Sequence, residues 1–207
     1  STKKMHKIKL DEKKNNLKIG IRNQKKNIIS ICRFVDQKNI FEIFKIAKKL
    51  KIYNFIVLGE GYLFDKAKIF LKSSNIQNVY LFGNQTDIFK YLYESDLFLS
   101  TSLYEGHPIS ILEAMSIGLP IVASKVTGNI DTIKNNYSGI FYTLGDINEA
   151  VNCIEKILKN IEFKRKISNN SFLTHRQLFT IEKMKIDYLS LYKKHDKYSQ
   201  KLNFLKR

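Results

Sequence analysis

The sequence predicts an α/β fold in which a parallel sheet of six strands carries helices on both faces. Short apolar, β-branched runs alternate with amphipathic stretches of helical period across 27–160, and the segment 161–207 has helical character. Such alternation is typical of βαβ units, whose crossover connections make the strands parallel. We therefore expect a Rossmann-like, doubly wound sheet followed by C-terminal helices.

Apolar runs predict the strands, and amphipathic stretches between them predict the crossover helices. The stretch at 39–50 places Ile40, Phe44 and Leu50 on one helical face, and the stretch at 62–74 repeats this pattern. Parallel strands connected in this way bring their C-terminal ends to one edge of the sheet, where ligands bind. The predicted strands are 28–32, 54–58, 79–82, 97–101, 120–124 and 140–142.

The net charge of +17 belongs to the two ends of the chain. Residues 1–26 contain ten Lys or Arg and two acids, residues 156–207 contain fourteen and four, and the segment between is nearly neutral. Only five of the basic residues are arginines, so a surface that reads nucleic-acid bases is not expected. Solvated flanks and contact with an anionic membrane surface are the two alternatives.

The sequence also predicts where the protein is located in the cell and whether the chain is part of a longer protein. No stretch contains the roughly 18 to 20 apolar residues that span a bilayer, so we expect a cytoplasmic protein, free or peripheral at the inner face of the cytoplasmic membrane. The chain begins at Ser1 rather than at methionine, which favours a piece of a longer protein. Residues 1–26 are predicted to be a basic linker that leads into the first strand.

The segment 100–124, STSLYEGHPISILEAMSIGLPIVAS, is the most informative part of the chain. Its first strand is expected to end near Thr101, after which Pro108 takes the first position of a helix. Gly118 can end that helix in a left-handed conformation, and a further strand follows. A strand, a short loop and a helix N-terminus in this order predict an anion site at the sheet edge.

The chemistry of this anion site follows from backbone amides. The free N–H groups of Ile109, Ser110 and Ile111 are expected to point out of the helix N-terminus toward a phosphate, assisted by the helix dipole. Gly106 lets the backbone approach that phosphate closely. No spacing of His, Cys or acidic residues suggests a metal site, and we expect neither a metal nor another cofactor.

Two carboxylates flank the helix start, Glu105 before it and Glu113 inside it, with seven residues between them. A carboxylate can accept from both hydroxyls of a ribose, which suits Glu113. Glu105 would then lie beside a transferred sugar.

This E-x7-E pattern, within S-L-Y-E-G-x-P-x-S-x-L-E-A-M-x-x-G-x-P-I-V-A-S, resembles the signature of glycosyltransferase family 4, the group 1 glycosyltransferases. The resemblance covers roughly residues 27–194 and implies one half of a two-domain GT-B fold, with 27–160 as the nucleotide-sugar-binding domain. By the same resemblance, residues 1–26 are a linker from a missing N-terminal acceptor domain. The last helix, which is predicted to include Phe179, Met184, Tyr188, Leu191 and Tyr192, is similar to one that crosses back onto that domain.

The resemblance also assigns residues outside this segment. In ISICRFVDQKN, Arg33 and Lys38 stand where the family binds the donor diphosphate, and Cys32 replaces the usual glycine. A bidentate guanidinium and a compact ammonium suit that task. In VLGEGYL, Gly59 resembles a glycine of the family's second turn, although turn glycines most often serve the turn alone.

The activity implied is transfer of a sugar from a nucleotide diphosphate-sugar, UDP- or GDP-linked, with retention at the anomeric carbon. Glu105, Arg33 and Lys38 would be the catalytic residues, and bacterial surface polysaccharide or glycolipid synthesis the setting. Without its acceptor domain, the fragment is expected to be inactive. The alternatives are a sugar-nucleotide epimerase on the same plan and a non-catalytic basic module that retains the fold.

Overall fold

A computed structural model describes residues 25–204, with side chains described up to residue 193. The predicted linker at 1–26 therefore lies outside the described residues, apart from its last two. The elements follow in the order β1 (Asn27–Ile31), η1 (Asp36–Lys38), α2 (Ile40–Lys49), β2 (Asn54–Leu58), α3 (Phe64–Ser73), β3 (Val79–Leu81), α4 (Ile88–Tyr93), β4 (Leu97–Ser100), α5 (Ile109–Ser116), β5 (Ile121–Ser124), α6 (Asn129–Thr132), β6 (Ile140–Tyr142), α7 (Ile147–Lys159), α8 (Ile161–Leu178) and α9 (Ile181–Phe204).

The predicted parallel sheet of six strands is confirmed, in the order β3-β2-β1-β4-β5-β6. The chain builds outward from β1 to β3, returns to place β4 beside β1, and then builds outward on the other side. In register, Ile28 pairs with Leu97. Because the strand order reverses between β1 and β4, the loops that follow these two strands diverge and leave a crevice.

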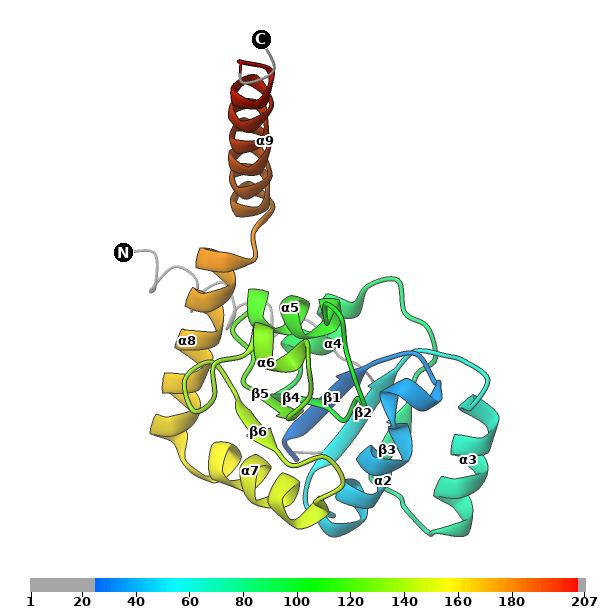
Figure 1. Ribbon diagram of the computed structural model, residues 1–207. Helices are drawn as coiled ribbons and strands as arrows, with labels where there is room; N and C mark the ends of the chain where they lie inside the picture. The colour runs from blue at the N-terminus through cyan, green and yellow to red at the C-terminus, as the bar shows by residue number, and fades with distance from the viewer. Residues whose placement is uncertain (1–24, 205–207) are drawn as a thin grey trace.

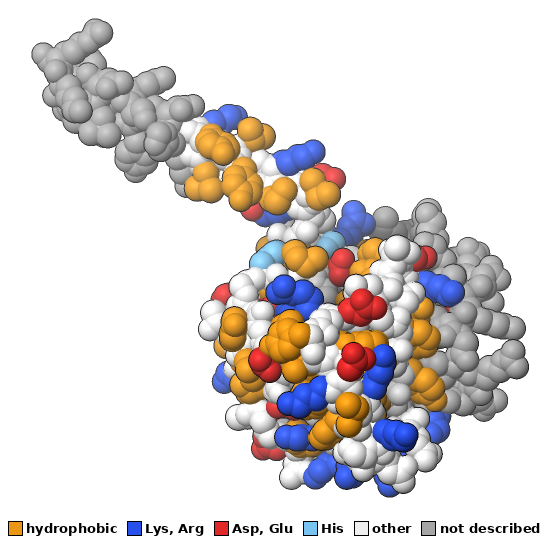
Figure 2. All heavy atoms as spheres, turned by 90° about the vertical axis from the view of Figure 1, so that its right-hand side faces the viewer, with side chains coloured by type: hydrophobic (Ala, Val, Ile, Leu, Met, Phe, Trp, Pro, Cys, Tyr) orange, Lys and Arg blue, Asp and Glu red, His pale blue; other side chains and the backbone are white. Residues whose placement is uncertain are grey.

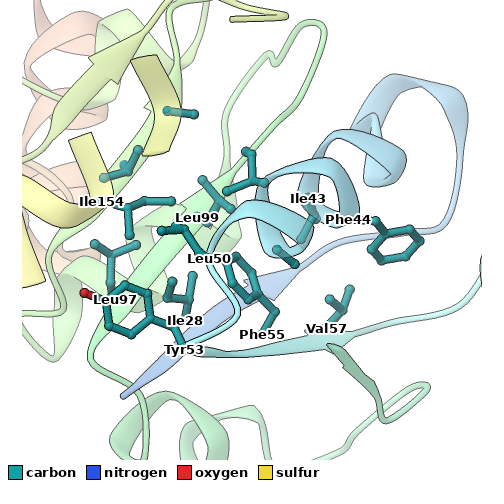
Figure 3. Packing of buried hydrophobic residues seen from close by; sticks show 14 of the residues in the cluster. Ile28, Ile43, Phe44, Leu50, Tyr53, Phe55, Val57, Leu97, Leu99 and Ile154 are labelled. Atoms are coloured by element: carbon teal, nitrogen blue, oxygen red, sulfur yellow. The ribbon is translucent and has the colours of Figure 1, made fainter. Parts of the chain in front are cut away.

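Helices cover both faces of the sheet, as Figure 1 shows, with α2, α3 and α7 on one face and α4, α5 and α6 on the other. Alternate residues of each strand point to opposite faces, so every strand supplies both layers. Ile28, Phe55 and Leu97 pack under α2 (Figure 3), whereas Ile29 and Phe98 pack under α5. Burial of each such side chain contributes about 1.5–3 kcal/mol, which explains the continuous apolar runs in the strands.

The amphipathic faces predicted from the sequence are buried as expected. Ile40, Phe44 and Leu50 are no more than 3% exposed. At the start of α7, the Asp146 carboxylate accepts from the Glu149 N–H at 2.9 Å, which satisfies one free amide of the helix.

The last helix begins later than the sequence suggested. Phe179 donates its N–H to the carbonyl of His175 at 2.8 Å and so closes α8, and α9 starts at Ile181. The prediction that Phe179 belongs to the final helix is therefore wrong. Helix α8 packs along α5, while α9 projects from the body (Figures 1 and 2) with apolar side chains exposed between lysines.

Candidate functional site

Lys38 and Glu105 form an ion pair where the loops after β1 and β4 meet. The Lys38 Nζ lies 2.5 Å from Glu105 Oε1, and the two side chains are 15% and 8% exposed. The Ser102 hydroxyl donates to the same carboxylate oxygen at 2.6 Å. An ammonium has three N–H donors, so Lys38 keeps donor capacity for a ligand while it holds Glu105.

A pocket opens at this point of the sheet edge. Its lining includes Cys32, Lys38, Glu105 and Ser110, together with residues from the ends of β1 and β4. The pocket therefore lies at the reversal of strand order, where ligands of open α/β sheets bind. Burial raises the pKa of the Cys32 thiol to about 12, which favours the neutral thiol.

The N-terminus of α5 differs in detail from the prediction. Pro108 is the N-cap rather than the first helical residue, with φ −78° and ψ 83°. Its carbonyl accepts from both the Ile111 N–H at 3.0 Å and the Leu112 N–H at 3.2 Å. The Ile111 amide is therefore not free, because the first turn tightens in the way common at helix termini.

The two preceding amides of α5 fit the prediction. Within the described part of the chain, the N–H groups of Ile109 and Ser110 have no acceptor. Ile109 is 57% exposed, and Ser110 lines the pocket. Two free amides at the positive end of a helix dipole can bind an anion.

The other end of α5 is closed as predicted. Gly118 has φ +75°, its N–H donates to Met115, and the Leu119 N–H donates to Ala114. This pair of hydrogen bonds is the Schellman arrangement, which needs a left-handed residue.

Glu113 lies one turn after Ile109, on the same side of α5. It is half-buried, and no hydrogen bond or ion pair to its side chain occurs among the described residues. Burial raises the pKa of this carboxyl group. A half-buried carboxylate without a partner is unfavourable in the ligand-free protein, and hydroxyl donors from a ligand would relieve that.

The glycines near the site serve different purposes. A Cβ on Gly59 would lie 2.0 Å from the Cys32 carbonyl oxygen, and one on Gly128 would lie 2.4 Å from that of Glu105. Both residues have positive φ and are required by these close crossings of loops. Gly106 has open space around its Cβ position, which leaves room for a ligand. Donor contacts at Gly59 and Gly106 stay predictions.

Arg33 follows β1 and is exposed, and its guanidinium makes no hydrogen bond or ion pair among the described residues. Neither it nor Glu113 lines the pocket around Lys38 and Glu105. The structure thus brings together Lys38, Glu105 and the helix N-terminus, and leaves Arg33 on the outside of the same loop.

Sequence reasoning missed Ser102 and Thr101. Ser102 contacts the Glu105 carboxylate, and Thr101 contacts the main chain of Lys38. Their only signal was a run of hydroxyl residues, STS, at the end of a strand.

Two features are absent from the described residues. They hold no group of three or more His, Cys, Asp or Glu side chains arranged for a metal ion. No helix within them is long and apolar enough to cross a membrane.

Comparison with known proteins identifies the family. The sequence model of the family described as glycosyl transferases group 1 matches residues 11–173 of this chain. The UDP-Gal:alpha-D-GlcNAc-diphosphoundecaprenol alpha-1,3-galactosyltransferase of Escherichia coli is 32% identical over 147 residues, which cover 67% of this chain and 38% of that protein.

Solved structures of other glycosyltransferases superpose on this chain. A Staphylococcus aureus TarM mutant in complex with fondaparinux, alpha-GlcNAc-glycerol and UDP superposes with a TM-score of 0.76 at 27% identity, over 85% of this chain and 38% of that one. A glycosyltransferase from Rickettsia africae superposes with a TM-score of 0.80 at 20% identity, over 90% of this chain and 52% of that one. The chain therefore spans less than two thirds of these proteins. Because the family model matches most of its length, this chain belongs to the group 1 glycosyl transferases.

Proposed function

We propose that this chain is the donor-binding domain of a retaining glycosyltransferase that uses a nucleotide diphosphate-sugar. The observation that carries the proposal is the pocket at the strand-order reversal, where Lys38 and Glu105 lie beside Ser110 at the start of α5. A cation and free helix amides at one edge form a site for a diphosphate.

In this proposal the diphosphate bridges the two loops. The ammonium of Lys38 and the N–H group of Ser110 approach it from the pocket. The N–H group of Ile109, at the exposed start of α5, and the exposed guanidinium of Arg33 approach it from outside the pocket. Glu105 accepts from Lys38 in the ligand-free protein and so orients the ammonium before the donor arrives. Positive groups fixed in advance stabilise the charge that develops on a departing diphosphate.

The ribose is assigned to Glu113. Its carboxylate has no competing partner among the described residues, and it lies on the side of α5 that Ile109 leaves exposed. Donation from two ribose hydroxyls would compensate for its partial burial.

The transfer itself needs little from protein bases. In a front-face displacement with an oxocarbenium-like transition state, the bond from the anomeric carbon to the phosphate oxygen breaks while the acceptor oxygen bonds on the same side. The departing phosphate oxygen takes the acceptor proton. The residues of this chain then act by positioning the donor and by neutralising charge.

The nucleotide is proposed to be UDP, with GDP as the alternative. UDP is present in the TarM complex, which is 27% identical to this chain. The name of the Escherichia coli galactosyltransferase includes UDP-Gal and alpha-D-GlcNAc-diphosphoundecaprenol, a lipid-linked sugar. We accordingly propose a role in bacterial surface polysaccharide or glycolipid synthesis.

The acceptor is assigned to a second domain outside this chain. The exposed apolar side chains of α9, which include Met184, Tyr188 and Leu191, suit contact with that domain. Lys185 and Lys193 on the same helix suit weak, additional contact with an anionic membrane surface.

Isothermal titration of this chain with UDP, GDP and uridine tests the proposal. Weak binding of UDP, tighter than that of uridine, is expected because uridine offers no charge to Lys38 and Arg33. Equal affinity for UDP and uridine, or no binding of any nucleotide, would contradict it and favour a non-catalytic module. Conversion of a UDP-sugar to its epimer without an acceptor would favour an epimerase.

A further inference from the structure

A second contact holds Lys38 to the loop that follows β4, through the main chain. The hydroxyl of Thr101 donates to the carbonyl of Lys38 at 2.9 Å and to that of Asn39 at 3.1 Å. One hydroxyl has a single proton, so the two carbonyls share it as a three-centre hydrogen bond. Thr101 is 2% exposed, which shields the bond from water.

The turn after Lys38 is fixed from its other side as well. Asn39 has φ 48° and ψ 46°, a left-handed conformation that is unfavourable for residues other than glycine, although less so for asparagine. Its side-chain amide donates to Glu42 Oε2 at 2.8 Å. The hydroxyl of Tyr142, at the end of β6, donates to Glu42 Oε1 at 2.8 Å.

Glu42 is a buried carboxylate, 6% exposed, that forms no ion pair within the described residues. Its burial is unfavourable unless hydrogen bonds satisfy it. These bonds all converge on the turn that carries Lys38, so the network fixes the backbone from which that side chain extends. Thr101 adds what Glu42 cannot, a link from this turn to the strand that leads into α5.

We infer that Thr101 is a positioning residue for Lys38. By holding the main chain of Lys38, Thr101 fixes the place of the ammonium relative to the N-terminus of α5. The inference rests on the proposed function, in which both groups bind one diphosphate. Lys38 comes from the loop after β1 and the amides of Ile109 and Ser110 come from the helix after β4. The hydroxyl of Thr101 connects the two loops by donating to the main-chain carbonyl of Lys38, and the carboxylate of Glu105 connects them by accepting from the Lys38 ammonium.

The variants Thr101→Val and Thr101→Ser test this role in the full chain, with UDP and uridine as probes. Valine keeps the shape and removes the donor, so UDP should bind about fivefold more weakly, the equivalent of one hydrogen bond, while uridine binding stays unchanged. Serine retains the hydroxyl and should restore UDP binding. Uridine affinity is measured by ligand-observed NMR.

Thr174→Val is the matched control. Thr174 is also buried, and its hydroxyl donates to the Asn170 carbonyl within α8 at 2.7 Å, away from the pocket. This control should leave UDP affinity as it is in the unmodified chain. Unchanged UDP affinity in Thr101→Val, an equal loss for UDP and uridine, or no restoration by serine would each overturn the inference.

Lys38→Met separates this inference from the proposed function. If Lys38 binds the diphosphate, Lys38→Met weakens UDP binding, and adding Thr101→Val to it causes no further loss because the positioned group is gone. Unchanged UDP affinity in Lys38→Met contradicts the proposed role of Lys38 itself. A loss in Lys38→Met together with no loss in Thr101→Val overturns the positioning role alone.

Discussion

The ammonium of Lys38 contacts the carboxylate of Glu105 at 2.5 Å, across the point where the strand order of the sheet reverses. The two residues are 67 positions apart and follow neighbouring strands. Their contact joins the two loops from which a diphosphate site can be built.

Breaking this pair from one side should destabilise the fold. In Lys38→Met, the Glu105 carboxylate, 8% exposed, loses its cation, which should lower the free energy of unfolding by about 2 kcal/mol. The double variant Lys38→Met with Glu105→Gln should recover most of that loss because no buried charge remains. Urea denaturation measures both.

Lys159→Met is the control for this comparison. It breaks the exposed pair between Lys159 and Glu155, whose side chains are 61% and 30% exposed, and should leave the free energy of unfolding nearly unchanged. If Lys38→Met proves as stable as the unmodified chain, the buried pair does not hold the two loops together.

Glu113→Gln should change stability and binding in opposite directions. Burial raises the pKa of Glu113 in the folded protein, so the folded state holds this proton more tightly than the unfolded state does. Stability therefore falls as pH rises from the unfolded pKa through the folded one. Glu113→Gln, which cannot ionise, should melt at a higher temperature than the unmodified chain at pH 7 and at nearly the same temperature at pH 4.

The same variant should bind UDP more weakly by about 1 to 3 kcal/mol, because charge-assisted hydrogen bonds to the ribose become neutral ones. Glu162→Gln, an exposed acid on α8, is the control and should leave UDP binding unchanged. An unchanged dissociation constant for UDP in Glu113→Gln would remove the ribose assignment.

The two glycines beside Glu105 should respond differently to alanine. Gly128→Ala forces a Cβ to within 2.4 Å of the Glu105 carbonyl oxygen at a residue with φ +83°, and should cost about 2 kcal/mol of stability. Gly106→Ala meets no protein atom within 4 Å and should leave stability unchanged while it weakens UDP binding. Denaturation and calorimetry on both variants check this, and UDP affinity unaffected by Gly106→Ala would argue against a close approach there.

Weak binding to anionic vesicles should depend on lysines of α9. Each lysine near an anionic surface contributes roughly 1 kcal/mol to the binding free energy of a polybasic segment. The double variant Lys185→Gln with Lys193→Gln should therefore weaken vesicle binding by about 2 kcal/mol. Binding of the full chain should nearly vanish at about 0.5 M salt, where the Debye length falls to about 4 Å.

Vesicles of phosphatidylglycerol and phosphatidylcholine, sedimented with the full chain, provide the measurement. The matched control is Lys45→Gln with Lys48→Gln, which removes the same charge from the exposed side of α2. An equal loss in both double variants, or no binding at low salt, would show that α9 has no specific part in membrane contact.

The sequence was sufficient for the features that depend on local pattern. Apolar runs located the strands to within a residue. The residues around Glu105 and Lys38 marked both as candidates, and the structure brings their side chains into contact. Features that depend on how loops fold together were not accessible. Pro108 captures the Ile111 amide only because the first turn of α5 tightens, and the link from Thr101 to Lys38 exists only because β1 and β4 are neighbours.

The boundary between α8 and α9 was missed for a similar reason. Phe179 continues the apolar period of the last helix in sequence, yet its side chain packs against the cluster beneath α5. Tertiary packing therefore ends α8 at this residue, and periodicity alone could not predict the break.

A crystal structure of this chain with bound UDP would show directly where the diphosphate lies. We expect the diphosphate within hydrogen-bond distance of the Lys38 ammonium and of the N–H groups of Ile109 and Ser110, with the ribose hydroxyls on Glu113. A diphosphate bound elsewhere, with the pair of Lys38 and Glu105 untouched and the start of α5 open to solvent, would contradict it.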